Sequence, residues 1–292
     1  MSHELLRPRS VAELLDVAFT LIRAHFAVFA TLATVAALPL LVTSAIALAM
    51  YPEGSEAASS VDIGPTIITA VLAIFAWLWF FIAGSSLIFA TADAYRGQPV
   101  EAGSAFRRAM RATGDVLGAS VAKYVVLIGI FFAAAIVGGI LGAVSPVLAV
   151  AVVCVGLGAV IVLTLRWYTV TSVAALEGVT GSDALSRSRK LMRDAGARAF
   201  LMLLVTFALQ LSFTLAGSAA AGLAGEFSGA NTLDAIGSSL WLLVFPFANV
   251  IEAVMYFDQR IRTEGFDLEL MTQQLGGVAE TAAGSPFDQQ RT

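Results

Sequence analysis

Charged residues are scarce in this 292-residue chain, and their scarcity excludes an ordinary soluble protein. Only 13% of the residues are charged and 58% are hydrophobic, whereas soluble domains carry about 25% charged residues. There are 17 Lys and Arg against 21 Asp and Glu, for a formal net charge of −4, so no basic excess points to a nucleic-acid partner. The composition predicts an integral membrane protein.

Residues that build metal centres and nucleophilic sites are almost missing as well. The chain has one cysteine, Cys154, and two histidines, His3 and His25. A lone cysteine excludes an intramolecular disulfide and a cysteine-based zinc site, and two histidines do not form a His-rich metal site. No nucleophile elbow, HExxH motif or phosphate-binding loop occurs in the sequence. We therefore expect a non-enzymatic protein with no catalytic residues, no metal and no cofactor.

Long apolar runs are abundant. A bilayer core of about 30 Å needs about 20 apolar residues in a helix, and runs of that length occur six times. We predict an all-α, polytopic membrane domain over residues 1–275, followed by a disordered cytoplasmic tail over 276–292. The predicted spans lie near 26–50, 66–92, 116–143, 147–173, 199–224 and 236–257.

The few charges are strongly partitioned between the two kinds of connector. The connectors at 51–65, 144–146 and 225–235 contain five acidic residues and no Lys or Arg, while 15 of the 17 cations fall on the other side. Lys123 and Arg166 are the cations left inside apolar runs. The positive-inside rule places both termini and the basic connectors in the cytoplasm. There the basic face would meet membrane lipids with anionic headgroups.

Three cytoplasmic segments, beginning at Ser10, Glu101 and Thr180, align without gaps at offsets of 91 and 170 residues. Each precedes a pair of predicted spans and places apolar or small residues at i, i+1 and i+4, as in an amphipathic interfacial helix. Ser10 with Glu13 and Thr180 with Asp183 fit capping boxes. The pattern predicts three parallel-repeat hairpins. The alternative is that polytopic proteins need such connectors anyway and that short alignments arise by chance.

Close helix packing is predicted where small residues are spaced four apart. Gly138 and Gly142 form a GxxxG motif in the third span, and such motifs let two helix backbones approach closely in lipid. Trp77 and Trp79 fall near the middle of the second span, where packing is their expected role.

A group of polar side chains is predicted at the cytoplasmic ends of the spans. At 1.5 Å per residue, Arg166 and Glu252 both lie near the inner interface. A functional interpretation is a polar vestibule for an anionic headgroup or an ion. The structural interpretation is snorkelling cations and interhelical ion pairs, with Arg166 and Glu252 as the expected pair. The candidate cluster consists of Asp93, Lys123, Arg166, Asn249 and Glu252.

Four stretches carry a family resemblance: 6–16 with Phe19 and Arg23, the Leu-Pro-Leu at 38–40, 176–179 followed by 184–188 and 191–193, and the Tyr-Phe-Asp-Gln-Arg-Ile-Arg-Thr-Glu-Gly-Phe-Asp-Leu-Glu-Leu at 256–270. Together they resemble an uncharacterised bacterial family of six-span membrane proteins related to the glycerophosphoryl diester phosphodiesterase membrane domain. The resemblance implies a multi-pass protein of the bacterial cytoplasmic membrane. The catalytic domain that names the group is absent, so its activity is not carried over.

The sequence favours a scaffold or accessory factor for an envelope or lipid-related process. The alternative is a small-solute or lipid transporter with a polar site between the hairpins. The stretch 256–270 is either a helix packed beneath the bundle or a docking site for a protein partner. The oligomeric state stays open.

Overall fold

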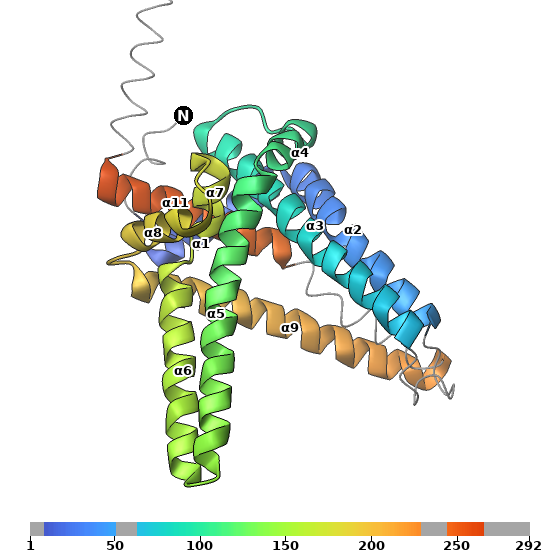
Figure 1. The fold of residues 1–292 in the computed structure, drawn as a ribbon. Helices are drawn as coiled ribbons and strands as arrows, with labels where there is room; N and C mark the ends of the chain where they lie inside the picture. Colours follow the sequence, from blue (N-terminus) through green and yellow to red (C-terminus); the bar gives the residue numbers. More distant parts are fainter. Residues whose placement is uncertain (1–8, 51–62, 229–243, 266–292) are drawn as a thin grey trace, which may run out of the picture.

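The computed structural model describes residues 9–50, 63–228 and 244–265, and within these ranges all regular secondary structure is helical. Five helical stretches are long and apolar enough to cross a membrane (Figure 1). The all-α membrane class predicted from the sequence is therefore confirmed. The five stretches are Phe26–Ala47, Ile63–Arg96, Thr113–Gly142, Pro146–Glu177 and Gly196–Ala220.

Short and long helices alternate along the chain. The helices in order are α1 (Val11–Ala24), α2 (Phe26–Met50), α3 (Ile63–Arg96), α4 (Ala102–Arg111), α5 (Thr113–Gly142), α6 (Pro146–Arg166), α7 (Val170–Glu177), α8 (Gly181–Leu191), α9 (Gly196–Ser228) and α11 (Phe245–Glu264). The predicted sixth span, 236–257, lies partly outside the described residues, and α11 is not among the five membrane-length stretches. The predicted tail at 276–292 lies wholly outside the described residues.

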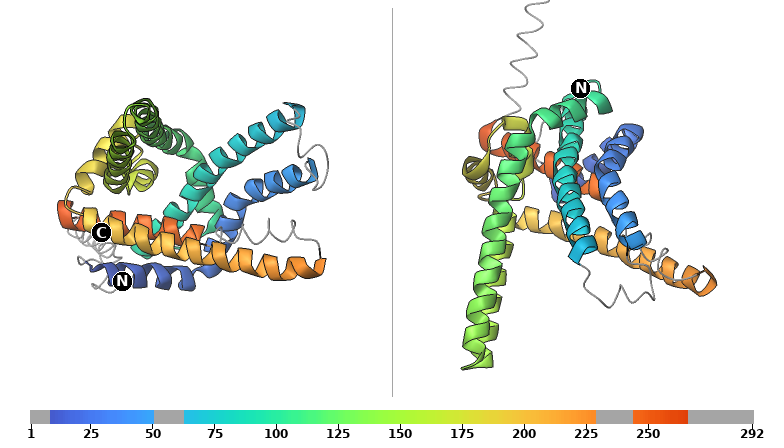
Figure 2. Two further views of the ribbon diagram at one scale, coloured as in Figure 1. Left: turned by 90° about the horizontal axis from the view of Figure 1, so that it is seen from below. Right: turned by 45° about the vertical axis from the view of Figure 1, so that its right-hand side comes forward.

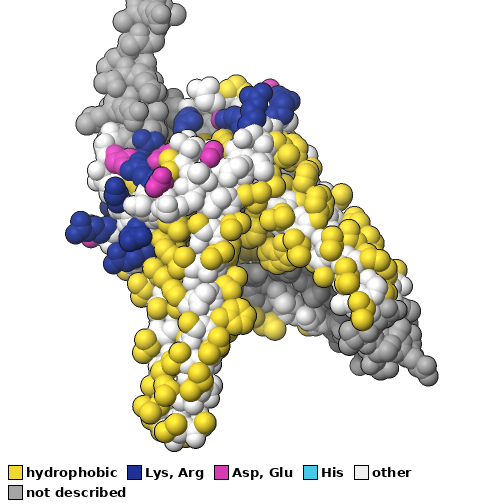
Figure 3. All heavy atoms as spheres, viewed as in Figure 1, with side chains coloured by type: hydrophobic (Ala, Val, Ile, Leu, Met, Phe, Trp, Pro, Cys, Tyr) yellow, Lys and Arg dark blue, Asp and Glu magenta, His cyan; other side chains and the backbone are white. Residues whose placement is uncertain are grey.

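The helices form two hairpins that spread from one charged end. α2 pairs with α3, and α5 pairs with α6. The two hairpins diverge and α9 runs in a third direction (Figures 1 and 2). The hairpins carry most of the exposed large hydrophobic side chains, whereas acidic and basic side chains gather at the end where the hairpins meet (Figure 3). This polarity is that of a molecule with an apolar membrane part and one polar face.

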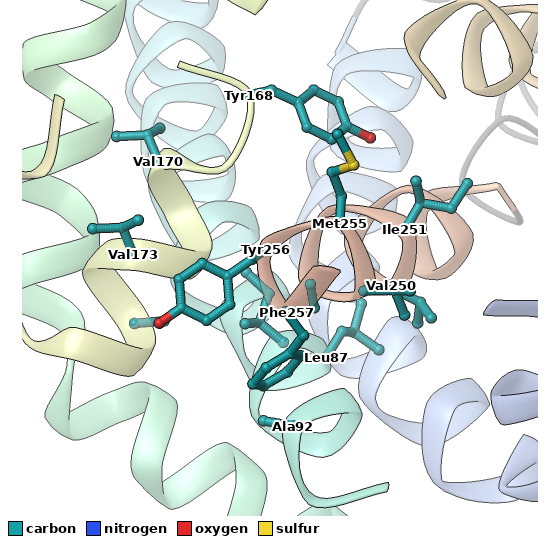
Figure 4. Close-up of a cluster of buried hydrophobic side chains, with 14 of the residues drawn as sticks. Leu87, Ala92, Tyr168, Val170, Val173, Val250, Ile251, Met255, Tyr256 and Phe257 are labelled. Carbon is teal, nitrogen blue, oxygen red and sulfur yellow. The ribbon is translucent and has the colours of Figure 1, made fainter. Parts of the chain in front are cut away.

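The packed core lies at the charged end rather than between the long helices. The second half of α3 is buried, as are most of α7 and α11. Phe257 and Tyr256 of α11 lie among Leu87, Ala92 and Val173 from α3 and α7 (Figure 4). The ring of Phe257 also stacks on Tyr95 of α3 at 4.7 Å. Burial of aromatic rings contributes strongly to the stability of such a junction, so α11 packs the α2–α3 hairpin against α7.

The three short helices that precede long ones are α1, α4 and α8, and they are buried at equivalent positions. Leu14 and Ala18 of α1 are buried, and so are Ala105 and Ala109 of α4 and Ala184 and Ser188 of α8. These pairs stand at the offsets of 91 and 170 residues, and the N-cap residues Ser10, Glu101 and Thr180 do as well.

The two expected capping boxes have different outcomes. In α1, Ser10 accepts the backbone N–H of Glu13, whose carboxylate accepts the N–H of Ser10 at 2.7 Å, so this prediction is confirmed. The box at Thr180 and Asp183 is wrong, because Thr180 makes no side-chain cap bond in α8. Its hydroxyl instead lies 3.5 Å from the carbonyl oxygens of Gly114 and Asp115 in α5, which share its one proton.

One predicted span contains a turn near its C-terminal end. The apolar run 147–173 ends its first helix at Arg166, and α7 starts at Val170 after a turn. In that turn the Thr169 hydroxyl lies 3.2 Å from the hydroxyl of Ser188 in α8. Hydropathy reports composition alone, so it does not register a turn that is fixed by a contact with a distant helix.

Small residues bring α5 and α6 together, as the GxxxG motif predicts. A Cβ added at Gly138 would lie 3.0 Å from Val153, and one at Gly156 would lie 2.3 Å from the Cβ of Ala134. The two backbones therefore approach each other where side chains are smallest.

A tryptophan compensates for the proline inside α2. Pro39 has no N–H, so the carbonyl of Val35 loses the partner that a helix normally gives it. The indole Nε1 of Trp79 in α3 donates to that carbonyl at 2.9 Å. The Trp79 ring also lies 5.9 Å from Phe106 of α4. Trp79 thus links three helices.

Candidate functional site

The predicted cluster of Asp93, Lys123, Arg166, Asn249 and Glu252 lies at the charged end, but its five members do not converge on one place. Asp93 at the end of α3 binds Arg108 of α4 through both carboxylate oxygens, with Nη1 to Oδ1 at 3.0 Å. The guanidinium of Arg108 also lies 5.1 Å from the ring centre of Phe89. Asp93 therefore holds α4 against α3.

Glu252 of α11 caps another helix. Its Oε1 accepts the backbone N–H of Ser172 at 2.9 Å and lies 3.2 Å from the Ser172 hydroxyl. Ser172 is the third residue of α7, whose own N-cap, Thr169, makes no side-chain cap bond. A carboxylate satisfies a free N–H at a helix N-terminus and interacts favourably with the helix dipole. Glu252 thus replaces the missing local cap.

The expected Arg166–Glu252 ion pair is not formed between these two described residues. The side chain of Arg166, at the end of α6, is exposed. Asn249 donates to the carbonyl of Phe245 in its own helix at 2.9 Å. Lys123 of α5 is close enough to Glu252 for an electrostatic interaction, and its Nζ lies 5.7 Å from the Tyr124 ring centre. Within the predicted cluster only Lys123 and Glu252 interact.

Asp258 is the most buried carboxylate of the charged end, with its side chain 1% exposed. Its Oδ2 accepts from Arg198 at the start of α9 at 3.0 Å and from Arg262 at 2.8 Å. Its Oδ1 accepts the backbone N–H of Arg9 at 2.9 Å, and Arg262 also donates to the carbonyl of Arg9 at 2.6 Å. One carboxylate therefore joins the segment before α1, the start of α9 and α11.

A second network joins α7, α8 and α11. Arg187 of α8 binds Glu177 through Nε at 2.7 Å and Nη2 at 3.0 Å, and it also binds Glu264. The hydroxyl of Tyr256 donates to Glu177 at 2.9 Å, and Arg260 donates to Glu264 at 3.1 Å. Bonds to Glu264 and Glu177 raise the pKa of Arg187 above its ordinary value. The hydrogen bond from Arg187 is the largest contribution that lowers the pKa of Glu264 below its ordinary value.

The described part of 256–270 is packed against the rest of the chain. Tyr256, Phe257, Asp258 and Gln259 are buried against the rest of the chain, as expected of a helix packed beneath the bundle. Residues 266–270 lie outside the described residues. Sequence reasoning singled out this stretch but missed that Asp258 and Arg262 turn inward. The i, i+4 spacing of Asp258 and Arg262 was the available signal.

The described acidic and basic side chains of the charged end form ion pairs and cap helices. In the ranges that the structure describes, no group of three or more His, Cys, Asp or Glu side chains is placed to hold a metal ion. Cys154 is exposed on α6, and the backbone N–H of His25 donates to Leu21 at the end of α1.

No protein-family model, curated protein or solved structure matches this chain.

Proposed function

We propose that this chain is a non-enzymatic, multi-pass protein of the bacterial cytoplasmic membrane that acts as a scaffold or accessory factor for an envelope or lipid-related process. The proposal includes six spans, the sixth near 236–257, and a charged end in the cytoplasm. The resemblance to the membrane domain found with glycerophosphoryl diester phosphodiesterases is part of this proposal.

One observation carries it: the packed core lies at the charged end. Asp93, Asp258, Glu177 and Glu252 each tie two or more helices together there. The long helices beyond it are mostly exposed. A transporter usually places its site between packed spans near the bilayer midplane. A rigid helical layer on one membrane face instead offers a fixed surface to partners.

The burial of the short helices supports the repeat. Chance alignment of apolar residues does not require that Leu14, Ala105 and Ala184 all face the interior, yet all three are buried. Each short helix is followed by a helix of membrane length. Units that enter the membrane from the same side are parallel repeats, which would set three amphipathic helices on the cytoplasmic face.

Site-specific photocrosslinking in native membranes tests the scaffold role. A photoreactive residue is placed at Arg107, exposed on α4, and at Val144, which is 80% exposed at the turn between α5 and α6. We expect a reproducible protein adduct from position 107 and no protein adduct from position 144. Lipid adducts alone from both positions would contradict the proposal.

The transporter alternative has one observation in its favour. Lys123 lies within a span and interacts with Glu252 without an ion pair between the two. An ionisable residue in a span is costly and often marks a substrate path. Replacing Lys123 with Met should leave the crosslinks at position 107 unchanged if the scaffold proposal holds.

A further inference from the structure

Some cations of the charged end point inward and form ion pairs, whereas others are exposed, and α8 contains both kinds. Arg187 points inward and binds Glu177 and Glu264. Arg189 and Lys190, two and three residues later, are exposed. Over the described ranges, neither has an ion pair or a side-chain hydrogen bond. The inward cation has a structural role in the fold that the outward pair does not share.

The outward pair lies beside two further cations. The Ser188 hydroxyl is 3.3 Å from the carbonyl of Arg166, which fixes the second half of α8 against the end of α6. Arg193 lies in the turn that leads from α8 into α9. Both Arg166 and Arg193 are exposed, and neither is ion-paired in the part of the chain that the structure describes. We name the set of Arg166, Arg189, Lys190 and Arg193 the α8 corner.

The sequence of this turn gives the α8 corner an excess of positive charge. Asp194, next to Arg193, is an exposed carboxylate in the turn, and Asp183 is an exposed carboxylate in the first turn of α8. The four cations of the corner therefore outnumber these two carboxylates, of which Asp194 alone is adjacent in sequence to a member of the corner. In Figure 3, Lys and Arg side chains gather over α8, directly above the apolar surface of α6.

An apolar surface continues below the corner. Ile161 and Val162 are exposed in the last turns of α6, and Phe200 and Leu204 are exposed in the first turns of α9. α6 and α9 contact each other, so their apolar surfaces are adjacent. Cations above an exposed apolar surface match the two parts of a phospholipid, a charged headgroup and acyl chains.

We propose that the α8 corner is a binding site for an anionic phospholipid of the cytoplasmic leaflet. The phosphate is held by Arg166 and Arg193 with Arg189 and Lys190 beside them, and the acyl chains lie along α6 and α9. Guanidinium groups suit this role because they bind phosphate oxygens with paired N–H donors. The site deepens the proposed function and rests on its placement of α8 at the membrane interface.

Lipid binding to the purified full-length chain in detergent tests the site. Native mass spectrometry would measure the affinity for dioleoylphosphatidylglycerol, with dioleoylphosphatidylcholine as the neutral lipid. The test variant is Arg166→Gln/Arg193→Gln. The matched control is Arg107→Gln/Arg111→Gln, which removes two exposed cations from α4. Each cation near an anionic surface changes binding about fivefold, so the test variant should bind phosphatidylglycerol about 30-fold more weakly.

The control variant should keep its phosphatidylglycerol affinity within about twofold, and phosphatidylcholine should bind all three proteins equally. An equal loss in both variants would overturn the site, because binding would then follow total charge. An unchanged affinity in the test variant would overturn it as well. Inorganic phosphate should not displace the lipid, and displacement would indicate an ion site instead. Crosslinking at position 107 tests the scaffold role separately, so the two failures are distinguishable.

Discussion

At the scale of single residues, buried acids at the charged end connect segments that are far apart in sequence. Asp258 lies 249 residues from Arg9 and 60 from Arg198, and it contacts both. Burial removes water from a carboxylate, and only several donors compensate for that loss. Asp258 has donors from three segments of the chain, which accounts for its presence in the core of a mostly apolar protein.

Replacing Asp258 with Asn should destabilise the fold by about 2–3 kcal/mol, because Arg198 and Arg262 lose a charged acceptor. The unfolding temperature of the full chain in detergent measures the effect. Asp16→Asn serves as the control, because Asp16 is an exposed acid on α1 and its replacement should have little effect. Equal unfolding temperatures for the two variants would contradict a structural role for Asp258.

The bond from Trp79 to Val35 should matter only while Pro39 is present. Trp79→Phe removes a hydrogen bond of about 1 kcal/mol within the membrane. In a Pro39→Ala background, residue 39 regains an N–H that bonds the Val35 carbonyl within α2. A double-mutant cycle on thermal stability should therefore give a smaller cost for Trp79→Phe in that background. Additive effects would show that the tryptophan acts through packing alone.

At the scale of helices, ion pairs at the charged end should make stability depend on pH. The bond from Arg187 lowers the pKa of Glu264 in the folded chain, whereas an unfolded chain has a Glu pKa of about 4.3. The folded state then binds this proton less tightly. Its stabilisation is complete above about pH 4.3 and is lost as the pH falls through the lower folded-state pKa.

The variant Glu264→Gln should therefore be less stable than the parent chain at pH 7, by about 1 kcal/mol or less because the pair is partly exposed. The difference should shrink as the pH falls below about 4.3. Unfolding temperatures in detergent between pH 7 and pH 3 provide the measurement. Glu101→Gln, at an exposed position before α4, is the control. A difference that stays constant over this range would refute the linkage.

Two glycines of α6 offer a matched test of hairpin packing. A Cβ at Gly156 would lie 2.3 Å from the Cβ of Ala134 in α5, while one at Gly158 would meet nothing within 4 Å. Gly156→Ala must push the two helices apart and should cost about 1–3 kcal/mol. Gly158→Ala should be neutral or slightly stabilising, since Ala favours helix. Thermal stability of both variants compares them, and a larger loss at Gly158 would mean that the α5–α6 contact is wrong.

Local patterns in the sequence predicted the helices well, but they could not predict contacts between segments that are far apart in sequence. The run at 26–50 coincides with α2, and the Ser10–Glu13 capping box formed because its partners are three residues apart. Thr180 binds carbonyls 65 and 66 residues away, which no local motif encodes. The candidate site shows the same limit. Glu252 was recognised as a costly charge near the membrane, but its partner is the N-terminus of α7.

At the scale of the whole molecule, the division of charge follows from the fold. Described acids that bind more than one partner, such as Asp258 and Glu264, lie at the same end as the exposed cations of α4 and α8. Acids used inside the core no longer balance the outward cations. A chain with a formal net charge of −4 thereby presents exposed cations at its charged end. The positive-inside rule associates such a cationic end with the cytoplasm.

Cysteine labelling would test the orientation directly. With Cys154 replaced by Ala, a single cysteine is introduced at Val144 in the α5–α6 turn or at Arg107 on α4, both exposed. A membrane-impermeant maleimide applied to intact bacterial cells without their outer membrane should label position 144 and leave position 107 unlabelled. Disrupted membranes should allow labelling at both. The reverse pattern in intact cells would place the charged end outside, and the lipid site on the α8 corner would then face the opposite leaflet from the one proposed.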